Sequence, residues 1–144
     1  MSSPQLDPSH CFSNNLYKTA RAVSRVYAQE MRPAGLARSQ FAILEHLMRS
    51  DGLPTSTLAQ RLYMERTTLT RNLRPLERAG WVSRTTASDD ARVKLVIITE
   101  PGRRKLKEAR SYWRKAQKRM LTMFGEDEWR QLEDSLRTMR RLVG

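Results

Sequence analysis

One stretch decides the fold: residues 54–99, which read PTSTLAQRLYMERTTLTRNLRPLERAGWVSRTTASDDARVKLVIIT. Apolar residues recur at helical spacing in its first two thirds and alternate at strand spacing in its last third. This pattern predicts a short helix, a longer basic helix and a two-stranded hairpin with a charged tip. The chain on either side also has helical periodicity, so the fold class is predicted to be mainly α with a small β element.

The longer helix has one aliphatic face and one basic face. Leu69, Leu73 and Leu76 recur at i, i+4 and i+7, which places them on one side of a helix. Arginine can bind guanine edges or phosphate, threonine can bond to either, and a helix fits the DNA major groove. The candidate DNA contacts on this helix are Arg66, Thr67, Thr68, Thr70, Arg71, Arg74 and Arg78. An ordinary solvated surface helix shows the same pattern. The neighbouring elements are therefore needed to distinguish a DNA-binding helix from a solvated one.

A short helix precedes the basic helix. Thr55 or Ser56 can cap its start, and Leu58 and Leu62 give it an apolar stripe. Residues 63–65 form a short connection. Two helices joined in this way, the second of them basic, are typical of a helix-turn-helix.

A hairpin follows directly. Gly80 can end the basic helix, and two alternating runs, 82–86 and 93–97, predict strands around a polar tip at 87–92. Residues 53–54 can add a third edge to this sheet. A hairpin after a helix-turn-helix is a wing, which reaches the DNA backbone or the minor groove. Its candidate contact residues are Arg84, Arg92 and Lys94, with Asp90 expected to hold Arg92 by a salt bridge.

The run from Leu58 to Gly102 resembles the winged helix-turn-helix of the MarR family of bacterial transcriptional regulators. The resemblance rests on Leu58-Ala59, Leu62, Thr67-Thr68-Leu69-Thr70-Arg71, Leu73, Leu76 to Val82, and a wing pattern of Asp90, Arg92, Leu95, Thr99 and Gly102, with Ile98 where the family has Leu. It implies a single domain over 1–144, with a winged helix-turn-helix at about 37–99 flanked by N- and C-terminal dimerisation helices at about 8–34 and 100–144.

Pro75 departs from an ideal helix. It removes the hydrogen bond to the carbonyl of Arg71 and crowds that carbonyl. We expect either a bend at this point or a helix packed tightly through its leucine face.

The charge distribution predicts a polyanionic partner. The 144 residues carry a net charge of +12, and Arg61 to Arg119 contains 17 Lys and Arg against 6 Asp and Glu. A basic membrane-binding helix is a weaker reading, because the stretch also contains strands. No apolar run is long enough to cross a bilayer, so no membrane partner is expected. One Cys suits a reducing cytoplasm, and one Cys with two His predicts neither a metal site nor a cofactor.

The flanking segments predict long amphipathic helices at about 8–31, 37–49, 100–124 and 126–142. Their apolar stripes exceed what a small winged unit can cover, so we expect the terminal helices to pack on each other and on a second copy. MarR-like proteins dimerise in this way. A homodimer would place two basic helices about one DNA turn apart, on a near-palindromic double-stranded operator.

Regulators of this family usually respond to a small molecule or an oxidant. Candidate pocket residues for a small-molecule effector are Tyr27, Met31, Phe41, Met64 and Trp113, each of which also reads as a core residue. Cys11 is a candidate redox thiol, because oxidant-sensing relatives carry a cysteine early in the first helix. It lies two residues before that cysteine's position, which Ser13 occupies, and an incidental residue is the competing interpretation.

The function predicted is a sequence-specific DNA-binding transcriptional regulator, chiefly a repressor that occludes a promoter. A non-specific architectural DNA- or RNA-binding protein is the alternative, because it would use the same charge. An enzyme is not expected. The adjacent Asp89 and Asp90 lie on a solvated turn, Cys11 has only distant His partners, and no Gly-rich phosphate loop is present.

Overall fold

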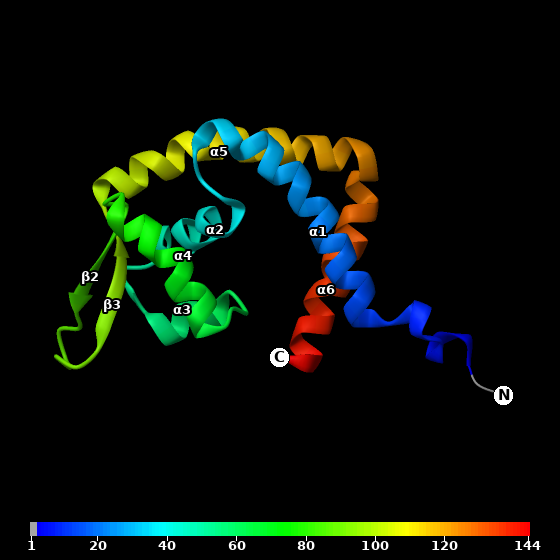
Figure 1. Cartoon of the computed structure of the whole chain (residues 1–144), viewed down its shortest axis with the longest axis horizontal. Coiled ribbons are helices and arrows are strands. Elements are labelled where there is room, and N and C mark those ends of the chain that lie inside the picture. The colour runs from blue at the N-terminus through cyan, green and yellow to red at the C-terminus, as the bar shows by residue number, and fades with distance from the viewer. Residues whose placement is uncertain (1–2) are drawn as a thin grey trace. The chain divides into compact units, whose positions relative to one another are not determined.

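The computed structural model describes residues 3–144 and contains two compact units. The central unit is Met31–Tyr112, and the terminal unit consists of the chain up to Glu30 together with the chain from Trp113 onwards. Helices α1 (Phe12–Met31) and α5 (Glu100–Phe124) each contribute residues to both units (Figure 1). The prediction that the whole chain forms one domain stays a prediction.

The central unit contains α2 (Arg38–Met48), α3 (Thr55–Arg61), α4 (Arg66–Arg78) and the first part of α5, after a short 3-10 turn at Arg32–Ala34. Its core is aliphatic and includes the three leucines predicted for the buried face of the basic helix. The fully buried side chains of this unit include Ile43, Leu44, Leu47, Leu58, Leu69, Leu73, Leu76, Val96 and Leu106.

Helix α4 continues through Pro75. A proline inside a helix costs about 3 kcal/mol, whereas each fully buried leucine stabilises by about 1.5–3 kcal/mol. Leu69, Leu73 and Leu76 are all fully buried, and Pro75 is exposed. Burial of the three leucines therefore stabilises α4 by more than Pro75 destabilises it, which agrees with the predicted tight packing.

The wing is a three-stranded antiparallel sheet of β1 (Leu53–Pro54), β2 (Val82–Thr86) and β3 (Lys94–Ile98), in the order β1-β3-β2. Strands β2 and β3 form a hairpin (Figure 1). Within it, Val82 pairs with Ile98 and Thr86 pairs with Lys94. The predicted third edge is confirmed. Strand β3 begins one residue later than expected, and it buries Val96 and Ile98.

A glycine stands at each end of the wing: Gly80 follows α4, and Gly102 lies in the first turn of α5. Gly80 has a φ of +77° and ends α4, as predicted. Thr99 caps α5, because its Oγ1 accepts a hydrogen bond from the Gly102 amide at 3.1 Å. A Cβ at Gly102 would lie 2.1 Å from the Trp81 carbonyl oxygen, so this position has no room for a side chain. That close approach accounts for the glycine of the wing pattern.

Two predicted helix starts are wrong. The first helix was expected from about residue 8, but Pro4–Leu6 and Pro8–His10 form separate 3-10 turns and α1 begins only at Phe12. Helix α3 begins at Thr55 itself, with Pro54 at the N-cap position. Pro54 also pairs with Leu95 in the sheet, so the chain passes from strand to helix with no residue left over for a Thr or Ser cap.

The terminal unit brings the two ends of the chain together. It contains α1 up to Glu30, α5 from Trp113 and α6 (Glu126–Val143). Arg119 Nη1 lies 3.3 Å from Glu30 Oε1, and the Tyr27 hydroxyl donates a hydrogen bond to Gln117 Oε1. The predicted packing of the first helix on the helices of the C-terminal half is confirmed within this unit.

Candidate nucleic-acid interface

Burial of the leucine face leaves the basic face of α4 exposed. Thr68 and Thr70 are half-buried, and the other predicted contact residues of this helix are exposed: Arg66, Thr67, Arg71, Arg74 and Arg78. The Thr70 hydroxyl donates to the Arg66 carbonyl oxygen at 2.9 Å, so its oxygen can still accept a further bond. The helix therefore presents guanidinium and hydroxyl groups on the side opposite its core contacts.

Asn72 anchors this helix to α2. Its Nδ2 donates to the Thr68 carbonyl oxygen at 2.9 Å, and its Oδ1 accepts a bond from Ser39 Oγ at 2.9 Å. Sequence reasoning missed this contact, because Ser39 and Asn72 lie on separate helices and no local pattern connects them. The bond fixes the rotation of α4 from its polar flank, while the leucines fix it from the core.

The wing tip is organised around Asp90, as predicted. Asp90 Oδ1 accepts the Arg92 backbone amide at 3.0 Å and lies 3.3 Å from Arg92 Nε. The Arg92 side chain is 92% exposed, which leaves most of its donors facing solvent. Lys94 Nζ donates to Thr86 Oγ1 at 3.1 Å across the hairpin. The tip thus has one cation on its turn, Arg92, and one at the start of β3, Lys94, both suited to phosphate contact.

Arg84 differs from the other predicted wing contacts. Its Nε donates to Glu77 Oε1 at 2.8 Å, and its Nη1 donates to Thr55 Oγ1 at 3.3 Å. Glu77 belongs to α4 and Thr55 to α3. The guanidinium is therefore engaged within the protein.

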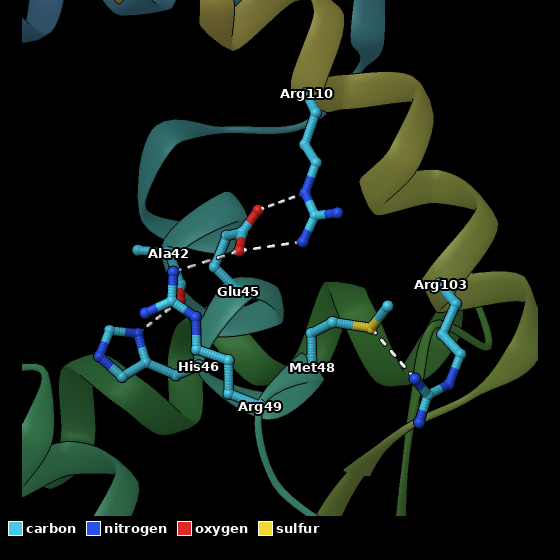
Figure 2. A network of polar contacts seen from close by, with 7 residues as sticks. All are labelled: Ala42, Glu45, His46, Met48, Arg49, Arg103 and Arg110. Carbon is cyan, nitrogen blue, oxygen red and sulfur yellow. Dashed lines mark hydrogen bonds and ion pairs between the residues drawn. The ribbon is translucent and has the colours of Figure 1, made fainter.

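A second acid–arginine cluster, also missed in the sequence, joins α2 to α5. Figure 2 shows Glu45 between two arginines, with Arg110 donating from Nε to Oε1 at 2.7 Å and from Nη2 to Oε2 at 3.2 Å. The hydrogen bond to Glu45 raises the pKa of Arg110. Arg49 Nη2 lies 4.0 Å from Glu45 Oε2, and Arg103 donates to the Met48 sulfur at 3.1 Å.

The five predicted pocket residues are divided between the units. Met31 and Phe41 are buried in the central unit, where Met64 is half-buried. Tyr27 and Trp113 belong to the terminal unit, where burial raises the pKa of the Tyr27 hydroxyl. Their role in binding an effector stays a prediction.

Cys11 is half-buried immediately before α1, and its amide donates to the Pro8 carbonyl oxygen at 3.2 Å. Its redox role also stays a prediction. Between residues 3 and 144 no cluster of His, Cys, Asp and Glu could hold a metal ion. In the same part of the chain, no helix has the length and apolar character needed to cross a bilayer.

Comparison with known proteins identifies the family. The model of the MarR family matches residues 36–94. The chain is 32% identical to the M. tuberculosis transcriptional regulator MOSR, solved in complex with DNA, over 92% of this chain and 96% of that one, with a TM-score of 0.81. The chain belongs to the MarR family. As a MarR-family protein it is a transcriptional regulator and not an enzyme, with a winged helix-turn-helix as its central unit.

Two Bacillus subtilis (strain 168) proteins add to this comparison. The HTH-type transcriptional regulator YdgJ is 31% identical over 109 residues, which are 76% of this chain and 66% of that protein. The organic hydroperoxide resistance transcriptional regulator is 26% identical over 98 residues, 68% of this chain and 65% of that one. The matched region thus spans about two thirds of each relative.

Proposed function

We propose that this MarR-family chain is a homodimeric repressor that binds a near-palindromic double-stranded DNA operator and is released by a small molecule or an oxidant. One observation carries the proposal: α4 buries its leucines and exposes Arg66, Thr67, Arg71, Arg74 and Arg78 beside a wing of the same unit. A basic helix of this kind can read base edges in the major groove, while the wing cations contact phosphates. A dimer bound across a promoter would exclude the polymerase, which is why we propose repression.

Selection of duplexes from a random pool at near-physiological salt tests the DNA-binding part. We expect a motif of two half-sites, with centres about 34–36 Å apart along the duplex. Arg71→Ala should reduce the preference for that motif over random DNA by about 1–3 kcal/mol. Arg104→Ala, an exposed cation on α5 outside α4 and the wing, is the matched control and should leave the preference unchanged. Recovery of no motif would favour the non-specific architectural alternative.

The terminal unit supports the dimer. Among the residues of this unit that the structure describes, only Ala116 is buried, so the unit has almost no core of its own. Phe12 is 74% exposed and Leu142 is 80% exposed. An open groove of about 830 Å³ lies between α1 and α6, lined by Phe12, Ser13, Leu16, Asp134, Ser135, Thr138, Met139, Leu142 and Val143. A second copy of the same helices would remove this apolar surface from water.

Sedimentation of the purified chain tests the dimer. The wild-type chain should sediment as a dimer, and Leu142→Asp should shift it towards monomer and weaken binding to the two-half-site duplex. Arg141→Asp changes the neighbouring exposed residue, which does not line the groove, and serves as the control. A wild-type monomer that still selects a two-half-site motif would contradict the dimer.

A small cavity in the terminal unit supports a small-molecule effector. It measures about 150 Å³ and includes Tyr27, the one predicted pocket residue that lies in it. Its walls are largely apolar, and the Tyr27–Gln117 hydrogen bond supplies a polar pair: the full lining is Thr19, Val23, Tyr27, Gln117, Met120, Leu121, Phe124, Trp129 and Leu132. A cavity of this size suits a compact, mostly apolar ligand. Filling it with Leu121→Phe should weaken the response to such an effector and leave DNA binding intact.

The oxidant alternative rests on Cys11 and on the similarity to the organic hydroperoxide resistance regulator. Duplex selection with and without peroxide tests it. Loss of the motif with peroxide, its recovery with thiol, and persistence of the motif in a Cys11→Ser variant would support the thiol as sensor. The same response to peroxide in Cys11→Ser would remove Cys11 from the proposal.

A further inference from the structure

Arg84 lies on the face of β2 that is turned towards the core of the central unit. In the sheet it is paired with Val96, which is fully buried, and it stands two residues after the buried Val82. Side chains two residues apart on a strand share a face, and directly paired residues do as well. Arg84 therefore shares a face with Val82 and Val96, which lies against the helices of the unit, although its own side chain is still 38% exposed.

Glu77 and Thr55 are the partners of the Arg84 side chain. Glu77 Oε1 accepts from Arg84 Nε at 2.8 Å, and Thr55 Oγ1 accepts from Nη1 at 3.3 Å. Glu77 lies in the last turn of α4, and Thr55 is the first residue of α3, directly after β1. One side chain thus connects a wing strand to both helices of the helix-turn-helix. These two bonds use two of the five N–H donors of the guanidinium and hold it against the helix-turn-helix.

We infer that Arg84 is a positioning residue for DNA binding: it holds the wing in place against α3 and α4 instead of contacting the duplex. The inference rests on the proposed DNA-binding function. It replaces the sequence-based prediction for this residue, and it leaves Arg92 and Lys94 as the wing cations that reach phosphate.

Positioning matters here because α4 and the wing tip have to engage one duplex together. Once α4 is seated, the contact made by the tip is intramolecular, and its effective concentration depends on how closely the tip is held to its target. A wing that moves relative to α4 has to be ordered on binding, which weakens affinity without removing any contact between a cation and a phosphate.

The dependence of DNA affinity on salt separates the two roles. Each phosphate contact contributes about 0.9 to the slope of log affinity against log salt concentration. Loss of a positioning residue lowers the affinity and leaves the slope as it was, whereas loss of a phosphate contact lowers the affinity and flattens the slope.

The experiment measures binding of a selected duplex over a range of salt concentrations for the wild-type chain, Arg84→Gln, Glu77→Ala and the double variant. Arg92→Gln is the control for a lost phosphate contact. Arg84→Lys keeps the charge but has no planar group to reach both Glu77 and Thr55, so it reports on geometry if Arg84→Gln folds poorly. Circular dichroism confirms folding before each measurement.

We expect Arg84→Gln to bind about 3- to 10-fold more weakly with an unchanged slope, because a tie between elements is removed and no ion-releasing contact is lost. Arg84→Lys should lose part of this affinity, and Glu77→Ala should weaken binding similarly. The double variant should be no weaker than Arg84→Gln, because both changes break one interaction.

Three results would overturn the inference. A slope flattened by about 0.9 in Arg84→Gln would make Arg84 a phosphate contact. Tighter binding by Glu77→Ala, lost again in the double variant, would mean that Glu77 only competes with DNA for Arg84. Unchanged affinity in Arg84→Gln would make the tie incidental. A wild-type chain that binds no duplex would instead remove the proposed function at the first step, and the positioning role with it.

Discussion

Arg110 and Glu45 form a two-point ion pair that joins α5 to α2 within the central unit, with N–O distances of 2.7 and 3.2 Å (Figure 2). The Glu45 side chain is only 20% exposed, so its carboxylate depends on this partner more than a surface acid would.

Arg110→Ala should lower the free energy of unfolding by about 1–2 kcal/mol, because it leaves a half-buried carboxylate without its main donor. Urea unfolding of the purified chain measures the change. Arg49→Ala is the matched control. Its guanidinium approaches the same carboxylate only to 4.0 Å and is 82% exposed, so it should change stability by less than about 0.5 kcal/mol. Equal losses in the two variants would contradict this division of roles.

Gly102→Ala should destabilise the chain more than Gly80→Ala. A Cβ at position 102 would meet the Trp81 carbonyl oxygen at 2.1 Å, which forces the backbone apart and should cost about 2–4 kcal/mol. Position 80 is open, so alanine there should cost only the penalty of a left-handed conformation, about 1 kcal/mol. Thermal unfolding of both variants measures the two losses of stability. A smaller loss for Gly102→Ala would mean that α5 can shift at its start.

Arg92→Ala should weaken binding to operator and to random DNA about equally, because the proposed contact of the wing tip is with the backbone and not with the bases. The magnitude of the salt slope should fall by about 0.9 for the lost phosphate contact. Asp90→Ala should weaken binding with little change of slope, since Arg92 keeps its charge but loses the carboxylate that orders it. A selective loss of operator binding in Arg92→Ala would place this residue on bases instead.

The midpoint of Tyr27 ionisation should lie above pH 10, because burial raises the pKa of its hydroxyl above the ordinary value of 10.0. The folded state favours neutral Tyr27, so this contribution to stability is complete below pH 10 and is lost as pH rises through the raised pKa. The ultraviolet absorbance of tyrosinate measures the titration, and Tyr27→Phe should remove signal from its high-pH part. A lost signal whose midpoint lies at or below pH 10 would instead contradict the raised pKa.

Local signals predicted much of the central unit. The leucine spacing of α4 identified its buried and exposed faces, because both follow from the period of one helix. Asp90 and Arg92 could be paired in advance, because they are two residues apart on one turn. The starts of α1 and α3 were predicted wrongly, because the start of a helix depends on where the preceding strand or turn ends, and composition does not determine that point.

The sequence by itself determined which residues form helices and strands, which side of α4 is apolar, and that a basic surface and a charged wing tip exist. These properties depend on neighbours along the chain. Only the tertiary structure decided that Arg84 is held by Glu77 and Thr55, that Glu45 holds Arg110, and that Asn72 is held by Ser39. Each partner lies on a different element, and the distance between two polar side chains on separate elements is set by how those elements pack.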